Sequence, residues 1–182
     1  MTDLELEQCI AEYGADIYSF CCSLTGSRQE ADDLYQDIFL KAVEKKNILD
    51  TSGNPKSYLL SVAVRVWKNQ RRKAAWRSRI EYEEQGGNRK TAGTDEPKRN
   101  RQNLYEHSPE YHMVRREVQQ EVRKAVEKLP DKMKVTVLLY YMEERSVEQI
   151  ADILQIPRGT VKSRLHKARK RLEKELEYML DE

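Results

Sequence analysis

Apolar side chains recur at steps of three and four residues along most of this chain, which places them on one face of an α-helix. In the first segment the repeat is carried by Leu6, Ile10, Tyr13, Ile17, Phe20 and Leu24. Seven glycines and five prolines among 182 residues are too few for a turn-rich all-β chain. The pattern therefore predicts an all-α fold.

Breaks in the repeat divide the chain into helical segments. The first helix is predicted at 3–24 and ends at Gly26. Ser27 and Glu30 form a capping box that begins a second helix. Five further helices are predicted at 56–79, 111–128, 131–143, 147–154 and 158–179.

The apolar repeat disappears between Glu81 and Ser108, where Gly86, Gly87, Gly93 and Pro97 lie among many charged residues. Such a composition cannot bury enough apolar surface to fold alone. The chain is therefore expected to form two small helical domains joined by a flexible linker. The predicted boundaries are 1–80 for the N-terminal domain, 81–110 for the linker and 111–182 for the C-terminal domain.

The net charge of +2 conceals two basic segments. Residues 1–64 carry 5 basic and 11 acidic side chains, whereas residues 65–101 carry 12 basic and 5 acidic ones. A second basic segment, Pro157–Lys174, has eight basic residues and one acidic residue. Two separate basic segments favour contact with a polyanion at two places. Each of them alone is equally consistent with a solvated helix face.

Several classes of protein are disfavoured by composition. The longest apolar stretch, Val135–Met142, is far shorter than the roughly 20 residues that cross a bilayer. The N-terminal residues are acidic and show no secretory signal pattern. Three cysteines, two of them adjacent, form no disulfide framework. We expect a cytoplasmic protein without membrane insertion.

A helix-turn-helix is the strongest motif. Ser146 and Gln149 form a capping box before the helix 147–154, and the short turn Gln155–Pro157 leads into the helix from 158. The second helix has a buried face of Val161, Leu165, Ala168 and Leu172. Its outer face carries basic and hydrogen-bonding residues, as a recognition helix in the major groove requires: Arg158, Thr160, Lys162, Ser163, His166, Lys167 and Arg169. An ordinary helical hairpin with a solvated face is the alternative.

The segment Ser146–Leu172 closely resembles the promoter-binding C-terminal domain of extracytoplasmic-function (ECF) sigma factors. The run Gly159–Leu165, followed by Ala168 and Arg169, carries most of the resemblance. The family usually has glycine at the position of Gln155, and a glutamine held there at positive φ would cost about 1 kcal/mol. The resemblance implies that the outer face of this helix binds the −35 element. We expect Lys162, Ser163 and His166 to reach base edges, and Arg158, Lys167 and Arg169 to contact phosphates.

The segment Glu30–Ala42 resembles the sigma-factor helix that binds the clamp coiled coil of the largest subunit of core RNA polymerase. Leu34 and Ile38 are expected to be buried. The resemblance implies that the polar outer face binds core polymerase through Asp33, Gln36, Asp37 and Lys41. It also implies an anti-sigma factor that holds the protein inactive.

The segment Ser57–Arg65 resembles the family helix that captures and opens the −10 element. Arg65–Arg79 has seven basic residues and no acidic one, together with Trp67 and Trp76. Cations hold phosphates and flat rings replace lost base stacking, so this composition suits strand opening. The family usually has Arg-Asn where this chain has Val64-Arg65. The residues expected at the −10 element are Tyr58, Arg65, Lys68, Arg71, Arg72 and Trp76.

The resemblance implies an ECF-type sigma factor that directs promoter recognition and transcription initiation and has no active site, cofactor or metal. Two other functions were considered. A stand-alone helix-turn-helix regulator would bind duplex DNA without polymerase, usually as a dimer. A metal-dependent nuclease could use the aspartates at 32, 33 and 37, but the sequence places no histidine near them and supplies no catalytic constellation.

Overall fold

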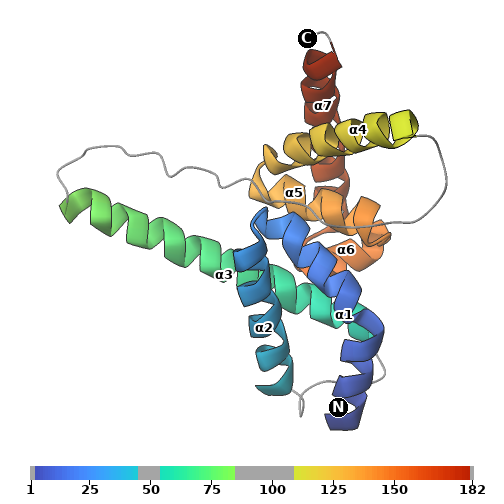
Figure 1. Cartoon of the computed structure of the whole chain (residues 1–182). Coiled ribbons are helices and arrows are strands. Elements are labelled where there is room, and N and C mark those ends of the chain that lie inside the picture. The colour runs from blue at the N-terminus through green and yellow to red at the C-terminus, as the bar shows by residue number, and fades with distance from the viewer. Residues whose placement is uncertain (1–2, 45–53, 85–108, 181–182) are drawn as a thin grey trace. The chain divides into compact units, whose positions relative to one another are not determined.

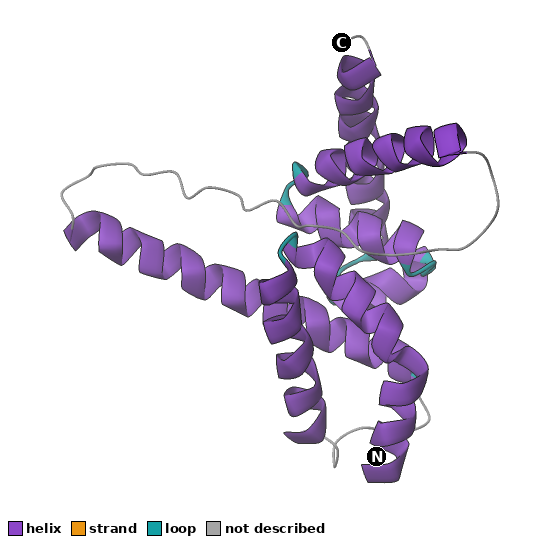
Figure 2. Ribbon diagram, viewed as in Figure 1, coloured by secondary structure: helices purple, strands orange, loops and turns teal. Residues whose placement is uncertain are grey.

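The computed structural model describes residues 3–44, 54–84 and 109–180. Every regular element in these ranges is helical and none is a strand, as Figure 2 shows. Figure 1 labels most of the elements, and their bounds are α1 Asp3–Thr25, α2 Arg28–Glu44, α3 Pro55–Glu84, α4 Pro109–Glu127, α5 Asp131–Val137, η2 Leu138–Met142, α6 Val147–Leu154 and α7 Arg158–Leu180. The all-α prediction is confirmed.

The chain divides into two compact units, Met1–Pro97 and Lys98–Glu182. α3 continues to Glu84 and α4 begins at Pro109, so residues 85–108 of the predicted linker lie outside the described residues. In the described ranges, no helix is both long and apolar enough to span a membrane.

The N-terminal unit is built from α1, α2 and α3. The core contains the predicted Ile17, Phe20 and Leu24 of α1, and Leu34 and Ile38 of α2, all essentially inaccessible to solvent. α3 contributes residues from its first half only: Leu59, Leu60, Val62, Ala63, Val64, Val66 and Trp67. Ile10, predicted on the buried face, is 36% exposed.

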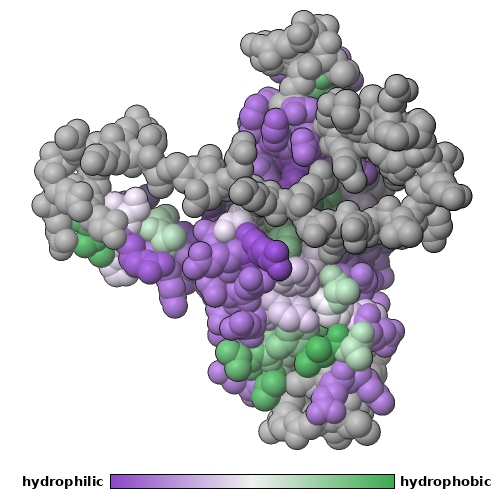
Figure 3. All heavy atoms as spheres, viewed as in Figure 1, coloured by the Kyte–Doolittle hydropathy of each residue, from purple (hydrophilic) through white to green (hydrophobic). Residues whose placement is uncertain are grey.

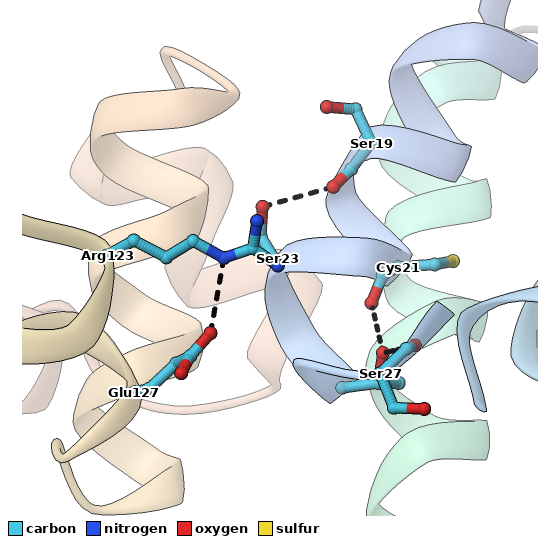
Figure 4. A network of polar contacts seen from close by, with 7 residues as sticks. Ser19, Cys21, Ser23, Ser27, Arg123 and Glu127 are labelled. Carbon is cyan, nitrogen blue, oxygen red and sulfur yellow. Dashed lines mark hydrogen bonds and ion pairs between the residues drawn. The ribbon is translucent and has the colours of Figure 1, made fainter. Parts of the chain in front are cut away.

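Gly26 ends α1, as the sequence predicted. Its φ of 76° lies in the left-handed region that favours glycine, and its N–H donates to the Cys22 carbonyl at 3.1 Å. Hydroxyl groups bond to carbonyls in the same segment: Ser23 Oγ donates to the Ser19 carbonyl at 3.1 Å (Figure 4). The helix end therefore leaves α2 free to turn back along α1.

The α1–α2 contact is close because α1 has a glycine where Tyr35 crosses it. A Cβ at Gly14 would lie 2.8 Å from Tyr35 Oη. The Tyr35 ring is held edge-on by Tyr18 and Phe39, at centroid distances of 5.5 and 4.7 Å. Tyr18 Oη in turn donates to Asp32 Oδ1 at 2.6 Å. This aromatic cluster fixes the separation of the two helices.

Two polar contacts connect α3 to the other helices of the N-terminal unit. Lys56 Nζ lies 2.6 Å from Asp16 Oδ2 of α1, and Gln70 Nε2 donates to Asp37 Oδ2 of α2 at 3.0 Å. The Asn54 side chain caps the start of α3 by accepting from the Ser57 N–H at 3.1 Å. These contacts set the register of α3 against α1 and α2.

In the C-terminal unit α4, α5 and α6 pack against α7, and η2 packs against α5 and α6. The core includes Val135, Leu139, Ile150 and Val161. The single α-helix predicted at 131–143 is wrong in its second half. Residues Leu138–Met142 form a π-helical turn, in which the Glu143 N–H donates to the Leu138 carbonyl at 3.1 Å. Such turns close over five residues instead of four.

Gly14→Ala is expected to test the α1–α2 contact. Alanine is normally better than glycine inside a helix by about 1 kcal/mol, but here its methyl group would meet Tyr35 Oη. Thermal unfolding should therefore show a lower Tm for Gly14→Ala, and a higher Tm when Gly14→Ala is added to Tyr35→Phe, which removes the hydroxyl. The same effect of Gly14→Ala in both backgrounds would contradict this account.

Candidate nucleic-acid interface

Most of the predicted −10 residues fall on one face of a long helix. Thirty residues of α-helix span about 45 Å, and Figure 1 shows the second half of α3 projecting beyond α1 and α2. Side chains three and four residues apart are neighbours on a helix. The predicted −10 residues Tyr58, Arg65, Lys68, Arg72 and Trp76 therefore form a stripe, which we call the α3 stripe.

The side chains of the α3 stripe differ in exposure. Arg65, Lys68 and Arg72 are exposed, and Trp76 is 66% exposed. Tyr58 is half-buried, its Oη is buried without a hydrogen-bond partner, and burial raises the pKa of its hydroxyl. The ring of Trp76 is therefore open to a ligand, whereas that of Tyr58 is partly packed.

Trp67 packs in the core of the N-terminal unit and is not open to a ligand. Its side chain is 4% exposed, and the Arg71 guanidinium carbon lies 5.9 Å from its ring centroid. Arg71, a predicted −10 residue, is exposed but lies to one side of the α3 stripe. The structure thus separates a buried tryptophan from an exposed one on the same helix.

The predicted outer face of α2 is exposed at Asp33, Gln36 and Lys41. Asp37 differs because it is half-buried and accepts the hydrogen bond from Gln70. Its carboxylate therefore also holds α2 to α3, which the sequence did not reveal.

An apolar residue lies within this polar face and was missed by the sequence analysis. Leu40 follows Asp33 by seven residues and Gln36 by four, so it lies on the same side of α2, and it is 62% exposed. Val43 and Ile10 are also exposed. Figure 3 shows apolar side chains gathered towards the C-terminal end of α2 and the N-terminal part of α1. Leu40 does not fit the three- and four-residue apolar repeat that contains Leu34 and Ile38. This departure was the signal in the sequence that could have identified it as exposed.

The helix-turn-helix has the predicted bounds at α6 and at the start of α7. The Gln149 N–H donates to Ser146 Oγ at 3.2 Å and the Ser146 N–H donates to Gln149 Oε1 at 3.0 Å, so the predicted capping box is confirmed. Ile150, Ala151 and Leu154 of α6 are buried, as are Val161, Leu165 and Ala168 of α7; Leu172 is half-buried.

Gln155 adopts the left-handed conformation of a glycine, with φ 54° and ψ 52°. The Ile156 N–H donates to the Ala151 carbonyl at 3.0 Å, as in a Schellman motif. Gln155 Nε2 also donates to the Asp152 carbonyl at 2.6 Å. The side chain thus adds a second donor to a carbonyl that already accepts from the Gln155 N–H, and it partly offsets the strain of the turn.

The outer face of α7 presents the predicted recognition residues. Arg158, Lys162, Ser163, His166, Lys167 and Arg169 are exposed, and Thr160 is half-buried. Arg158 Nη1 lies 3.8 Å from Glu148 Oε1 of α6. The Glu148 backbone N–H and the Ser146 hydroxyl are the main groups that lower the pKa of Glu148.

The described residues contain no group of three or more histidine, cysteine, aspartate or glutamate side chains placed to hold a metal ion. Burial raises the pKa of the Cys21 thiol to about 12, so this cysteine stays protonated at neutral pH. The predicted binding residues lie on three exposed helix faces, on α2, α3 and α7.

Comparison with known proteins finds one family model within each unit. The model for sigma-70 region 2 matches residues 9–77, and the model for sigma-70, region 4 matches residues 119–172. The ECF RNA polymerase sigma factor SigW of Bacillus subtilis is 30% identical over 165 residues, which cover 90% of this chain and 84% of SigW. SigL of Mycobacterium tuberculosis is 27% identical over 158 residues, with coverages of 86% and 80%.

Two solved structures share the fold. The sigma factor RpoE, in complex with the anti-sigma factor NepR from Bartonella quintana, has a TM-score of 0.69 and 24% identity and covers 95% of this chain and 97% of its own. CnrH, in complex with the cytosolic domain of CnrY, has a TM-score of 0.66 and 16% identity, with coverages of 97% and 90%. The two matched regions define a sigma-70-type factor. The chain belongs to the ECF RNA polymerase sigma factors.

The Gln155 turn predicts opposite effects of two small substitutions. Gln155→Ala keeps the positive φ and loses the bond to the Asp152 carbonyl, so it should destabilise the C-terminal unit by about 1 kcal/mol. Gln155→Gly loses the same bond but removes the left-handed strain of about 1–2 kcal/mol, which leaves it near the unsubstituted protein. Urea unfolding followed by circular dichroism measures the difference. Equal stability of the two variants would show that the turn is unstrained.

Proposed function

We propose that this chain binds core RNA polymerase as an ECF sigma factor and directs it to promoters through both of its units. The observation that carries the proposal is the pair of exposed basic faces, on α3 and α7, each held by a separate core within one member of this family. A sigma factor must contact two promoter elements, and two units supply one face for each.

The α7 face suits the −35 element. Lys162, Ser163 and His166 lie at neighbouring positions of the exposed face, where they can reach base edges in the major groove. Arg158, Lys167 and Arg169 extend the same face and are suited to phosphates. Substituting a base-contacting residue should cost about 1–3 kcal/mol at one position, whereas a phosphate contact should affect all sequences alike.

The α3 stripe suits the −10 element in its opened form. Its cations can hold the backbone of a single strand, and the exposed Trp76 ring can stack on an unpaired base. Tyr58 lies at the start of the stripe, in the half of α3 that packs in the core, and is half-buried. Arg65 takes the position where the family usually has asparagine.

The outer face of α2 suits core polymerase. It combines the exposed polar groups of Asp33, Gln36 and Lys41 with the exposed Leu40. Interfaces are typically strongest where an apolar anchor is surrounded by polar contacts that exclude water. We assign the clamp coiled coil of the largest subunit as the partner of this face.

Three further properties follow from family membership. The protein itself performs no catalytic chemistry, because the polymerase forms the RNA chain. It acts in the cytoplasm, where polymerase and promoter are found. An anti-sigma factor holds it inactive.

The alternative of a stand-alone regulator predicts tight duplex binding without polymerase, and gel filtration of the free chain would then show a dimer.

Core polymerase binding is predicted to depend on Leu40 and Asp33. Leu40→Ala and Asp33→Lys should each weaken the affinity for core polymerase by about tenfold, as expected for loss of an interface anchor worth more than 1 kcal/mol. Both residues are exposed, so the free energy of unfolding should change by less than about 0.5 kcal/mol. Asp37 is less suitable for charge reversal because it also accepts the bond from Gln70.

The matched control is Val122→Ala, which shortens an exposed valine of α4 in the other unit. The affinity of each variant for core polymerase is measured by fluorescence titration, and Val122→Ala should bind like the unsubstituted chain. If Leu40→Ala and Asp33→Lys also retain full affinity, the α2 face is not the polymerase interface.

Strand opening is predicted to depend on Trp76 and to be separable from folding. Loss of one stacking interaction worth about 1–3 kcal/mol should slow opening more than initial binding. Trp76→Ala should therefore reduce transcription from a duplex promoter much more than from the same promoter with a pre-melted bubble. Because Trp76 is 66% exposed, the Tm of the Trp76→Ala variant should be close to that of the unsubstituted protein.

Trp67→Ala supplies the contrast, since that ring is buried and its loss should cost about 3–5 kcal/mol. It should lower the Tm and reduce transcription from both templates. Tyr58→Ala should show both effects because the residue is half-buried. Equal losses on duplex and pre-melted templates for Trp76→Ala would exclude the stacking role.

A further inference from the structure

Arg169 of α7 is held by two tyrosines from the π-helical turn η2. Its Nε donates to Tyr141 Oη at 2.8 Å. Its guanidinium carbon lies 5.7 Å from the Tyr140 ring centroid and 5.8 Å from that of Tyr141. The two rings meet edge-on, with centroids 4.9 Å apart. The guanidinium is thus oriented by a hydrogen bond and two ring faces.

This arrangement leaves an unused set of hydrogen-bond donors. A guanidinium has five N–H donors, of which Nε–H is used by Tyr141. Tyr140 also interacts with the guanidinium, and because the Arg169 side chain is exposed, Nη donors remain available to a ligand. The Tyr141 oxygen accepts from Arg169, so its own O–H remains free to donate. A tetrahedral oxyanion with several acceptor oxygens is the ligand that matches a guanidinium fork beside a hydroxyl.

The Tyr141–Arg169 pair is accessible and lies on the recognition face. Tyr141 is 55% exposed, although Leu138 and Leu139 of the same turn are buried. Two turns of α-helix take about seven residues, so Arg169 lies two turns after Lys162 on the same side of α7. The pair therefore continues the exposed basic face toward the C-terminal half of the helix.

We infer that Tyr141 and Arg169 together bind one backbone phosphate of the duplex, with the Tyr141 hydroxyl as a direct ligand and as the group that orients the Arg169 guanidinium. The inference rests on the proposed binding of duplex DNA by α7 and adds to it a residue from outside the helix-turn-helix. It also gives the π turn a role, since this turn carries the hydroxyl to the edge of the recognition face.

A purely structural role for the pair makes a different prediction. In that case the contact only holds α7 against η2, and loss of the hydroxyl lowers stability without affecting bound DNA. Thr136→Val is a matched control for this possibility. Thr136 is fully buried in α5, and its hydroxyl donates to the Lys132 carbonyl at 2.7 Å. The control removes one neutral hydroxyl from the same unit at a place that DNA cannot reach.

The test measures binding of the full chain, in complex with core polymerase, to a fluorescein-labelled DNA duplex of fixed sequence, by anisotropy, over a titration with potassium chloride. Phosphate contacts do not depend on sequence, so any duplex serves as the probe. Tyr141→Phe should weaken binding about three- to tenfold without changing the slope of log K against log salt, because no charge is lost. Arg169→Ala should reduce that slope by about 0.9.

Coupling between the two residues decides the result. The double variant should bind no more weakly than Arg169→Ala alone if the hydroxyl and the guanidinium serve one phosphate. Thr136→Val should bind like the unsubstituted chain even if its Tm falls. Wild-type affinity in Tyr141→Phe, or equal losses in Tyr141→Phe and Thr136→Val, would overturn the inference.

Lys162→Ala and Lys167→Ala separate this inference from the proposed function. If these two variants weaken binding while Tyr141→Phe and Arg169→Ala do not, α7 binds DNA but the pair does not, and only the inference fails. If the unsubstituted chain neither binds the duplex nor supports transcription with core polymerase, the inference and the proposed function both fail.

Discussion

The burial of the first half of α3 is the interaction on which the N-terminal unit depends. Leu59, Val62, Val66 and Trp67 pack against α1 and α2, whereas residues 71–80 are all exposed. The buried half supplies the hydrophobic free energy that holds the helix, so the exposed half can project as a basic rod without a core of its own. The hydrogen bond from Gln70 to Asp37 lies where the two halves of α3 meet and connects α3 to α2.

In the C-terminal unit, too, one helix combines a buried side with an exposed basic side. Val161, Leu165 and Ala168 bury one side of α7, and the opposite side stays polar and basic. The angle between α6 and α7 depends on a turn in which Gln155 replaces the usual glycine, supported by its own side chain. Arg169 lies at the margin of the buried side of α7, and this position brings its Nε within hydrogen-bond distance of Tyr141 Oη.

Local rules predicted much of this structure because the signals are local. The Ser146–Gln149 capping box and the bounds of α6 follow from residues within one turn of each other. The π turn did not follow, since its sequence Leu138–Met142 has the apolar content of an α-helix and the turn reflects packing in the unit. Leu40, Tyr141 and the second role of Asp37 were also missed, because exposure and contacts between helices depend on tertiary structure.

The central claim is that this chain makes core polymerase start transcription at defined promoters through both of its units. Run-off transcription with core polymerase, on a library of promoter fragments, tests it most directly. The account predicts discrete start sites only when the chain is added, each lost when either the −10 or the −35 element is scrambled. Discrete transcripts that persist after the −35 element is scrambled, or no transcripts beyond those of core polymerase alone, would contradict it.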